Sequence, residues 1–290
     1  MLDYHLHLWP HGQPSATPRL EELAAYCERA AAAGVTEIAL TEHLFRFAQA
    51  DAVLAGFWED DPNPALRADM AAYWAEHAHA DLDVYVAAVE EAKAAGLPVV
   101  LGLEVDYYPG RMDKVAALLD GYPFDVLLGS VHWLGAWGFD NFDNPAVADE
   151  WSVRSVDAVW DAYTETLEEL AASGTVDVLA HPDLCKVIGR FPSPHLVDEF
   201  HQRMADAAAN AGVAAEVSSA GWRKPVGEAY PAPGLLTRFR ERGVPVTTAS
   251  DAHSLPDVAS RSADLRRLLA DAGYDELAAF RGRARRPVDL

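Results

Sequence analysis

The sequence predicts an α/β protein built as a parallel βα barrel, and three observations support this prediction. Helical segments that end in glycine alternate along the chain with short β-branched runs, as in "RAAAAGVTEIALTEH" and "RERGVPVTTASDAH". These runs are almost continuously apolar, which is typical of strands buried on both faces of a parallel sheet. Residues able to bind metal ions gather where the runs end. An open doubly wound sheet is the second candidate.

Seven strands are expected, in the order in which their motifs occur. The first lies in "DYHLHLWPHG", and the others lie in "GVTEIALTEH", "GLPVVLGLEVDY", "FDVLLGSVHW", "GTVDVLAHPD", "GVAAEVSS" and "GVPVTTASDAH". Helical stretches such as "PRLEELAAYCERAAAAG" and "VWDAYTETLEELAASG" supply the connections between parallel strands. Glycine after a helix accepts the left-handed backbone that ends it. Seven strands are one fewer than the usual barrel contains.

The alternation shows no domain break, so a single barrel is expected over residues 1–290, with insertions near 45–80 and 133–155. Both insertions follow strand ends, where long loops tend to be functional. They mix aromatic and acidic residues, which suits a small cationic substrate that carries a ring. Packing of the aromatic side chains onto the barrel explains them equally well.

Composition and charge exclude several classes of protein. With 290 residues, half of them hydrophobic, the chain can bury a sizeable core. The two cysteines, Cys27 and Cys185, give no disulfide framework, and neither a secretion signal nor a membrane span is expected. A formal charge of −22 disfavours attraction to nucleic acid or anionic lipid. We therefore expect a soluble cytoplasmic protein that binds a small molecule, with no nucleic acid and no membrane as partner.

Histidines and carboxylates at strand ends are the strongest functional signal. They are His5 and His7, Glu42 and His43, Glu104 and Asp106, His132, His181 and Asp183, Glu216, and Asp251 and His253. In a βα barrel these ends converge on one face, where active sites form. Four pairs have the i, i+2 spacing that directs both side chains to one side of a strand. The histidines in helical stretches are expected on the surface or at helix ends: His77, His79, His195 and His201.

Two imidazoles side by side need a shared partner. If His5 and His7 are buried without one, each carries an unsatisfied ring nitrogen, and protonating both places like charges together. A cation held between them removes both problems. Histidine and carboxylate ligands without cysteine suit Zn, Mn or Fe, and the number of ligands exceeds what one ion can use. More than one divalent metal ion is therefore expected.

The motifs that carry these residues resemble those of the PHP family, named for its polymerase-associated and histidinol-phosphatase members. They occur in the family's order, from the first strand to the last, as "HLHLWPHG", "TEH", "GLEVDYYPG", "GSVHW", "AHPDLCK" and "SDAH". The stretch "SSAGWRKPVGEAYP" looks like the segment that distinguishes histidinol-phosphate phosphatases, and "GSVHW…GFD" is similar to their substrate loop. The resemblance implies a distorted (βα)7 TIM-like barrel with three divalent metal ions. It also implies hydrolysis of L-histidinol phosphate to L-histidinol and phosphate, in histidine biosynthesis.

Carried over by motif, the resemblance assigns nine metal ligands. The first ion would be held by His5, His7, Glu104 and Asp251. Glu104 would bridge to a second ion completed by His132 and His181, and the third ion would be held by His11, His43 and His253. The gap between His7 and His11 is shorter than in the family's pattern.

The predicted chemistry follows from the ions. A metal-bridging hydroxide, between two ions about 4 Å apart, is a nucleophile at neutral pH, so no protein nucleophile is required. Asp183 and Asp106 have two open roles. Either they orient metal-bound histidines, or one of them protonates the leaving alkoxide.

Cationic side chains after the strand ends are candidates for binding a phosphorylated substrate. Arg223 offers a planar fork that suits phosphoryl oxygens. Lys186 and Arg190, which follow the "HPD" motif, are further candidates. Surface charge is the favoured interpretation of Arg190 and Lys224.

Three alternative functions stay open. A PHP-type phosphatase or phosphoesterase acting on another small substrate, such as a nucleotide, would use the same ions, although a nuclease normally shows a basic track that this chain lacks. A metal-dependent amidohydrolase is also a barrel with an H-x-H motif, but its relatives often carry a carboxylated lysine in the bridging role assigned here to Glu104. A non-catalytic metal-binding module would not need Arg223 and Lys186 beside the ions.

Overall fold

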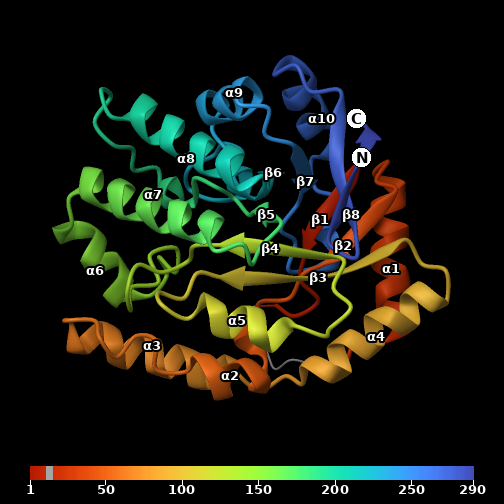
Figure 1. Ribbon diagram of the computed structural model, residues 1–290, viewed down its shortest axis with the longest axis horizontal. Coiled ribbons are helices and arrows are strands. Elements are labelled where there is room, and N and C mark those ends of the chain that lie inside the picture. The colour runs from red at the N-terminus through yellow and green to blue at the C-terminus, as the bar shows by residue number, and fades with distance from the viewer. Residues whose placement is uncertain (11–15) are drawn as a thin grey trace.

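The computed structural model describes residues 1–10 and 16–290, and it shows a barrel of parallel strands with helices around it (Figure 1). Seven strands form one sheet in chain order, and each pairs in parallel with the next: β1 Leu2–Leu6, β2 Glu37–Leu40, β3 Val99–Asp106, β4 Val126–Ser130, β5 Val178–Leu179, β6 Ala214–Ser218 and β7 Val246–Ala249. The predicted α/β barrel of seven parallel strands is confirmed.

The sheet closes on itself between β1 and β7. Leu6 pairs in parallel with Ala252, and the His7 N–H donates to the Ala252 carbonyl at 2.8 Å. Nearer the start of β1, the Asp3 carboxylate accepts hydrogen bonds from the Ser250 N–H and hydroxyl, each at 2.7 Å. Because the last strand contacts the first, the sheet is a nearly closed barrel and not an open doubly wound sheet.

The outer layer consists of helices that connect the strands. They are α1 Leu20–Ala32, α4 Leu82–Ala94, α5 Met112–Leu119, α7 Val156–Ala172, α8 Val197–Ala211, α9 Pro233–Glu241 and α10 Ser262–Asp271. The barrel strands are buried on both faces, which explains their near-continuous apolar sequence. Gly212 ends α8 with a φ of 71°, the left-handed conformation predicted for glycine at these positions. No helix in the described ranges is long and apolar enough to cross a membrane.

Further helices follow the carboxyl ends of the strands. After β2 come η1 Leu44–Arg46, α2 Ala48–Leu54 and α3 Pro64–His77, and after β4 comes α6 Pro145–Val153. The single-turn helices η2 Leu184–Lys186, η3 Ala220–Arg223 and η4 Leu255–Asp257 follow β5, β6 and β7. The amide of Asn63 donates to Glu150 Oε1 at 2.9 Å, so the segments after β2 and β4 contact each other. The expected domain limits, with insertions near 45–80 and 133–155, stay a prediction.

A C-terminal hairpin, β8 Glu276–Arg281 and β9 Ala284–Asp289, was missed by the sequence analysis. It lies across the amino ends of the barrel strands. The Gly282 N–H donates to Asp125 Oδ1 at 3.0 Å, and Arg283 Nε lies 2.9 Å from Asp177 Oδ2. Asp125 and Asp177 directly precede β4 and β5. The hairpin therefore covers the end of the barrel opposite to the predicted site.

Candidate metal centre

The carboxyl ends of the strands bring together eight of the nine predicted metal ligands, and the ninth, His11, lies outside the described residues. Donor atoms approach one another within 4.8 Å in four groups: His7, His43 and His253; His5, His7 and Asp251; His5, Glu104 and His181; and His43, Asp106 and His132. The groups share members, so they form one continuous cluster. A cluster of this composition can hold divalent metal ions.

Glu104, near the end of β3, is the centre of the cluster. Its Oε2 lies 2.7 Å from His43 Nδ1 and 3.2 Å from His5 Nε2. Its Oε1 lies 3.0 Å from His181 Nε2 and 3.3 Å from His132 Nε2. His7 Nε2 also lies 3.5 Å from Oε2. The two carboxylate oxygens thus face different sets of imidazoles, an arrangement that suits a carboxylate shared by two ions.

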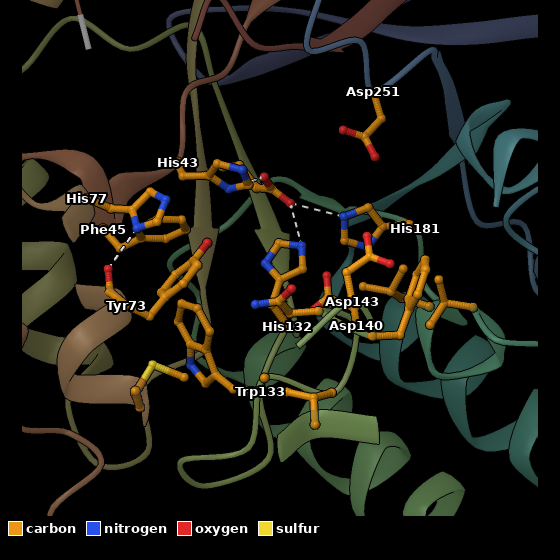
Figure 2. Close-up of a pocket in the computed structure, with 18 of the residues that line it drawn as sticks. His43, Phe45, Tyr73, His77, His132, Trp133, Asp140, Asp143, His181 and Asp251 are labelled. Carbon is orange, nitrogen blue, oxygen red and sulfur yellow. Dashed lines mark hydrogen bonds and ion pairs between the residues drawn. The ribbon is translucent and has the colours of Figure 1, made fainter. Parts of the chain in front are cut away.

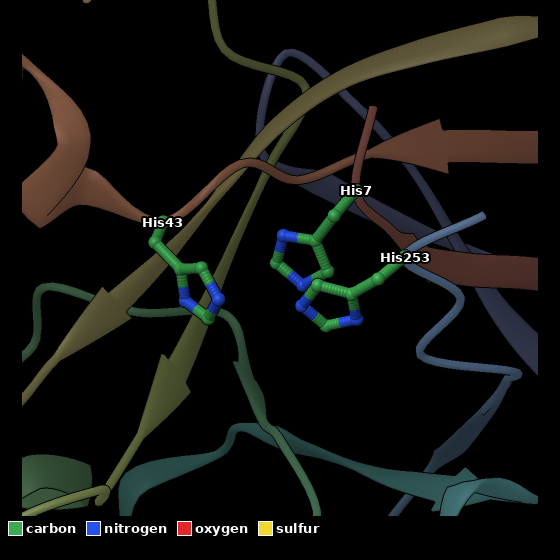
Figure 3. Close-up of side chains that lie close together, drawn as sticks. All are labelled: His7, His43 and His253. Carbon is green, nitrogen blue, oxygen red and sulfur yellow. The ribbon is translucent and has the colours of Figure 1, made fainter. Parts of the chain in front are cut away.

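His7 stands between two further imidazoles (Figure 3). Its ring centroid lies 4.2 Å from that of His43 and 4.1 Å from that of His253. Within the described residues, neither ring nitrogen of His7 makes a hydrogen bond. Burial, followed by the neighbouring His253 and His43, holds the pKa of His7 well below its usual value, so the ring is neutral. Buried neutral imidazoles this close fit a bound cation, because each has a nitrogen lone pair to offer.

Carboxylates hold the outer nitrogens of two imidazoles in the cluster. His5 Nδ1 lies 2.7 Å from Glu216 Oε2, and His132 Nδ1 lies 2.6 Å from Asp106 Oδ1. In both rings the opposite nitrogen, Nε2, faces Glu104. A carboxylate in this position fixes the orientation and tautomer of a metal-binding histidine. Asp106 thus has the geometry of the orienting role, while the strand end at Glu216 was noted in the sequence without an assigned role.

Two of the predicted ligands have a backbone conformation that is unusual for their residue type. The φ angle is 27° at His181 and 50° at Asp251, in the left-handed region that favours glycine. Such a conformation costs about 1–3 kcal/mol and persists where surrounding groups hold it, frequently at functional sites. The Tyr163 hydroxyl donates to the His181 carbonyl at 3.3 Å, and Arg223 Nη2 donates to the Asp251 carbonyl at 3.0 Å. These contacts keep both side chains directed into the cluster.

The cations that were expected to bind substrate are all engaged by protein groups. Arg223 Nη2 also donates to the Ser250 carbonyl at 2.8 Å. Arg190 Nη1 donates to the Trp151 carbonyl at 2.7 Å and so fastens α6. Lys224, for which surface charge was favoured, is exposed and also lines the cavity beside the cluster.

Lys186 and Asp183 form a buried ion pair next to the cluster. Lys186 Nζ lies 2.9 Å from Asp183 Oδ2 and 2.7 Å from Glu228 Oε1. The same Asp183 oxygen accepts a hydrogen bond from the Ala232 N–H at 2.7 Å. Neither Lys186 nor Asp183 is among the described residues that line the cavity. Their expected contacts with substrate stay a prediction.

A cavity of about 400 Å³ opens beside the cluster (Figure 2). Part of its wall consists of cluster residues: His43, Glu104, His132, His181, Asp251 and His253. Another part comes from the segments after β2 and β4, with aromatic side chains and four carboxylates: Phe45, Tyr73, Trp133, Phe142, Asp69, Glu76, Asp140 and Asp143. The cavity therefore combines a metal-binding wall with an aromatic and acidic wall.

His77 agrees with the expected position at a helix end but not with the expected exposure. It was placed on the surface or at a helix end, and it does end α3, but its side chain is buried and lines the cavity. Its Nδ1 donates to the Tyr73 carbonyl at 2.7 Å. The surface expectation is also wrong for His201, which is buried under α9, whereas His79 and His195 lie exposed in turns. Helical periodicity could not reveal which of these helices border the cavity.

The fold and the site define a metal-binding protein of the parallel-barrel class. The family model described as the PHP domain matches residues 3–220, which is most of the chain. The chain belongs to this family, and the resemblance seen in its motifs is confirmed.

Similar proteins extend the match beyond the family model. The chain is 35% identical over 287 residues to a "probable histidinol-phosphatase" of Deinococcus radiodurans, with 99% of each chain covered. It shares its fold with the histidinol phosphate phosphatase of Lactococcus lactis, solved with zinc, L-histidinol and phosphate (TM-score 0.68, 19% identity, 98% of each chain). It also shares its fold with a candidate histidinol phosphatase of Listeria monocytogenes (TM-score 0.73, 21% identity, 91% of this chain and 99% of the other).

Proposed function

We propose that the chain is a phosphoric monoester hydrolase that converts L-histidinol phosphate to L-histidinol and phosphate. The observation that carries the proposal is the joining of a metal-binding cluster to an aromatic and acidic cavity. The chain also matches, along its whole length, a relative whose name describes the same reaction. Histidinol phosphate carries a phosphate for the metal side, and an amine and an imidazole for the acidic and aromatic side. We expect the enzyme in the cytoplasm.

Three divalent ions, zinc, manganese or iron, would occupy the cluster. The proposed ligand sets are His5, His7, Glu104 and Asp251 for the first ion, Glu104, His132 and His181 for the second, and His11, His43 and His253 for the third. The donor groups around Glu104 support its shared role. The stacking of His7 with His43 and His253 supports the proximity of the first and third sets.

Bound ions supply Lewis acidity and an activated water for in-line displacement at phosphorus. The protein's own groups do the remaining work. Asp106 and Glu216 keep the rings of His132 and His5 turned toward Glu104. Arg223 holds the Asp251 backbone and would offer its remaining N–H groups to the phosphoryl oxygens.

The second part of the cavity wall would bind the remainder of the substrate. The carboxylates of Asp69, Glu76, Asp140 and Asp143 attract an ammonium or imidazolium group. Faces of Phe45, Tyr73 and Trp133 can pack on an imidazole ring and exclude water from the reacting phosphate. Such a wall favours histidinol phosphate over a nucleoside monophosphate, because the acids attract the cationic groups of histidinol phosphate and a nucleoside carries no comparable cation.

Phosphate release from a substrate panel tests the proposal. The panel contains histidinol phosphate, a nucleoside monophosphate, glycerol 3-phosphate and an amide substrate for the amidohydrolase alternative. We expect the highest kcat/KM for histidinol phosphate, more than one divalent ion per chain, and loss of turnover after chelation. Less than one ion per chain after metal-replete growth contradicts the metal assignment, and a higher kcat/KM for the nucleotide contradicts the substrate.

A further inference from the structure

The Tyr230 hydroxyl is a buried polar group that the proposed mechanism leaves unused. Tyr230 lines the cavity and is 1% exposed. Within the described part of the chain, its hydroxyl has no hydrogen-bond partner. Burying a hydroxyl without a partner costs free energy, and a hydroxyl of this kind on a cavity wall can be satisfied by a bound ligand.

The surroundings of Tyr230 place it on the metal side of the cavity. Its ring meets the ring of His181 edge to face, with the centroids 6.3 Å apart. The carboxylates close enough to influence it include Asp251 and Asp140, which also line the cavity. Burial, reinforced by these carboxylates and Asp183, raises the pKa of Tyr230 far above its usual value. A tyrosine hydroxyl carries its proton at neutral pH, so it can donate a hydrogen bond.

Three contacts hold the Tyr230 side chain in its position. The backbone of Tyr230 pairs with Ser218 at the end of β6, through hydrogen bonds of 2.6 and 3.1 Å. Gly221 packs against the ring so closely that a Cβ atom there would lie 3.1 Å from Tyr230 Cε2. Lys186 Nζ lies over the ring, 5.3 Å from its centroid.

We propose that the Tyr230 hydroxyl donates a hydrogen bond to a phosphoryl oxygen of the bound substrate. The inference rests on the proposed function, because it assigns a further contact within that site. Tyr230 lines the same cavity as His181 and Asp251, which are proposed to hold ions, so it offers a neutral donor on the side of the cavity where the phosphate would lie. It also gives the buried Lys186 a positioning role, since its ammonium lies beside the tyrosine ring.

Tyr230→Phe tests the contact, because it removes one oxygen and keeps the ring. We expect kcat/KM to fall about 10- to 100-fold, the effect of losing a hydrogen bond to a charged group. Inorganic phosphate should bind the metal-loaded variant more weakly by a similar factor in calorimetry. Metal content should not change. The midpoint of thermal unfolding of the metal-free protein should not fall, because an unpartnered buried hydroxyl has been removed.

Tyr108→Phe is the matched control. Tyr108 is also fully buried, and its hydroxyl has no partner in the described residues, but it does not line the cavity. Its replacement should leave kcat/KM and phosphate affinity within about twofold of the wild type. A similar loss in both variants would mean that the effect is general to the packing, and it would overturn the proposal.

Two substrates separate this inference from the proposed function. If Tyr230 contacts the phosphate, Tyr230→Phe lowers kcat/KM for histidinol phosphate and for glycerol 3-phosphate by the same factor. A loss confined to histidinol phosphate assigns the hydroxyl to the amine or the ring and overturns the inference. If the wild-type enzyme prefers another phosphomonoester, the proposed substrate fails, while the phosphate titration still decides the role of Tyr230. If Tyr230→Phe binds inorganic phosphate as tightly as the wild type does, the proposed contact between Tyr230 and the phosphate is overturned.

Discussion

Asp125 and Glu104 are both buried carboxylates, but they lie at opposite ends of the barrel and have different partners. At the amino end, Asp125 accepts hydrogen bonds from the Leu101 and Gly282 N–H groups at 3.1 and 3.0 Å, and from Lys93 Nζ at 2.8 Å. At the carboxyl end, the contacts described for the Glu104 carboxylate are with imidazole nitrogens. The hydrogen-bond donors around Asp125 belong to the chain and stabilise the fold. The imidazoles that surround Glu104 suit a bound cation.

The same contrast extends over the two ends as a whole. At the amino end, Asp177 pairs with Arg283 and accepts the Leu127 N–H at 2.8 Å, so the hairpin is fastened by groups that the chain itself supplies. At the carboxyl end, His181 and Asp251 hold unusual backbone angles. In βα barrels the active site forms at the carboxyl ends of the strands, whereas residues at the amino ends contribute to stability. Substitutions at the two ends should therefore change different measured quantities.

Glu104→Gln is expected to have the largest effect. The amide cannot replace a charged carboxylate that faces five imidazoles, so more than one ion should be lost and turnover should fall to background. Elemental analysis and phosphate release on the same preparation measure both effects. His11→Ala should weaken only the third ion, and equal metal loss in the two variants would contradict the shared role of Glu104.

Arg223→Ala distinguishes two roles of Arg223 at the carboxyl end, which are binding the substrate phosphate and holding the backbone of Asp251. Loss of a charge-assisted donor to the phosphoryl group should lower kcat/KM about 10²–10³-fold with metal content unchanged. Arg223→Lys should restore activity only in part, because a point charge lacks the paired hydrogen bonds. Loss of metal from the alanine variant would instead show that the hydrogen bond to the Asp251 carbonyl is the main role.

Asp106→Asn should have a smaller effect of the same kind. The asparagine can still accept a hydrogen bond from His132 Nδ1, but it no longer supplies negative charge behind the ring. Replacing such a partner usually lowers metal affinity or activity about 10- to 100-fold. Metal titration and steady-state kinetics measure this loss, and activity within about twofold of the wild type would remove Asp106 from the orienting role.

The sequence predicted the barrel and the cluster because both depend on local patterns. Buried strands between glycine-ended helices gave the seven strands, and i, i+2 pairs such as His5 and His7 gave the ligands at their ends. The hairpin β8–β9 gave no comparable signal. Its "RGRARRP" segment is polar and charged, and its pairing with Asp125 and Asp177 joins residues more than a hundred positions apart.

The substrate side of the cavity was harder to predict for a similar reason. Lys186 follows a ligand motif and is cationic, but only the fold shows that it is buried against Asp183 and Glu228. His77 lies in a helix of an insertion, and its place in the cavity depends on how that insertion packs. Residue type and spacing predict ligands that neighbouring strands present together. They do not reveal which side chains an insertion turns inward.

Asp125→Asn should have the smallest effect and should leave the site intact. Burial alone would raise the pKa of Asp125, but Lys93 and the N–H groups of Gly282 and Leu101 outweigh it and hold the pKa below 3.8. A carboxyl group with a lowered folded pKa stabilises the protein at pH values above its unfolded pKa, and this stabilisation is lost as the pH falls through the folded pKa. Replacement by asparagine should lower the free energy of unfolding at pH 7 by about 1–2 kcal/mol, because charged hydrogen bonds are lost.

The pH dependence completes the test of Asp125. The difference in unfolding free energy between wild type and Asp125→Asn should be constant from neutral pH down to about pH 4. It should narrow below the unfolded pKa of 3.8, because protonation removes the charge of Asp125 in the wild type. Denaturant titrations at several pH values measure it. Metal content and kcat/KM should match the wild type, because Asp125 lies at the opposite end of the barrel from Glu104. A loss of bound metal in this variant would show that the two ends are coupled, and the division between a stabilising end and a reactive end would then fail.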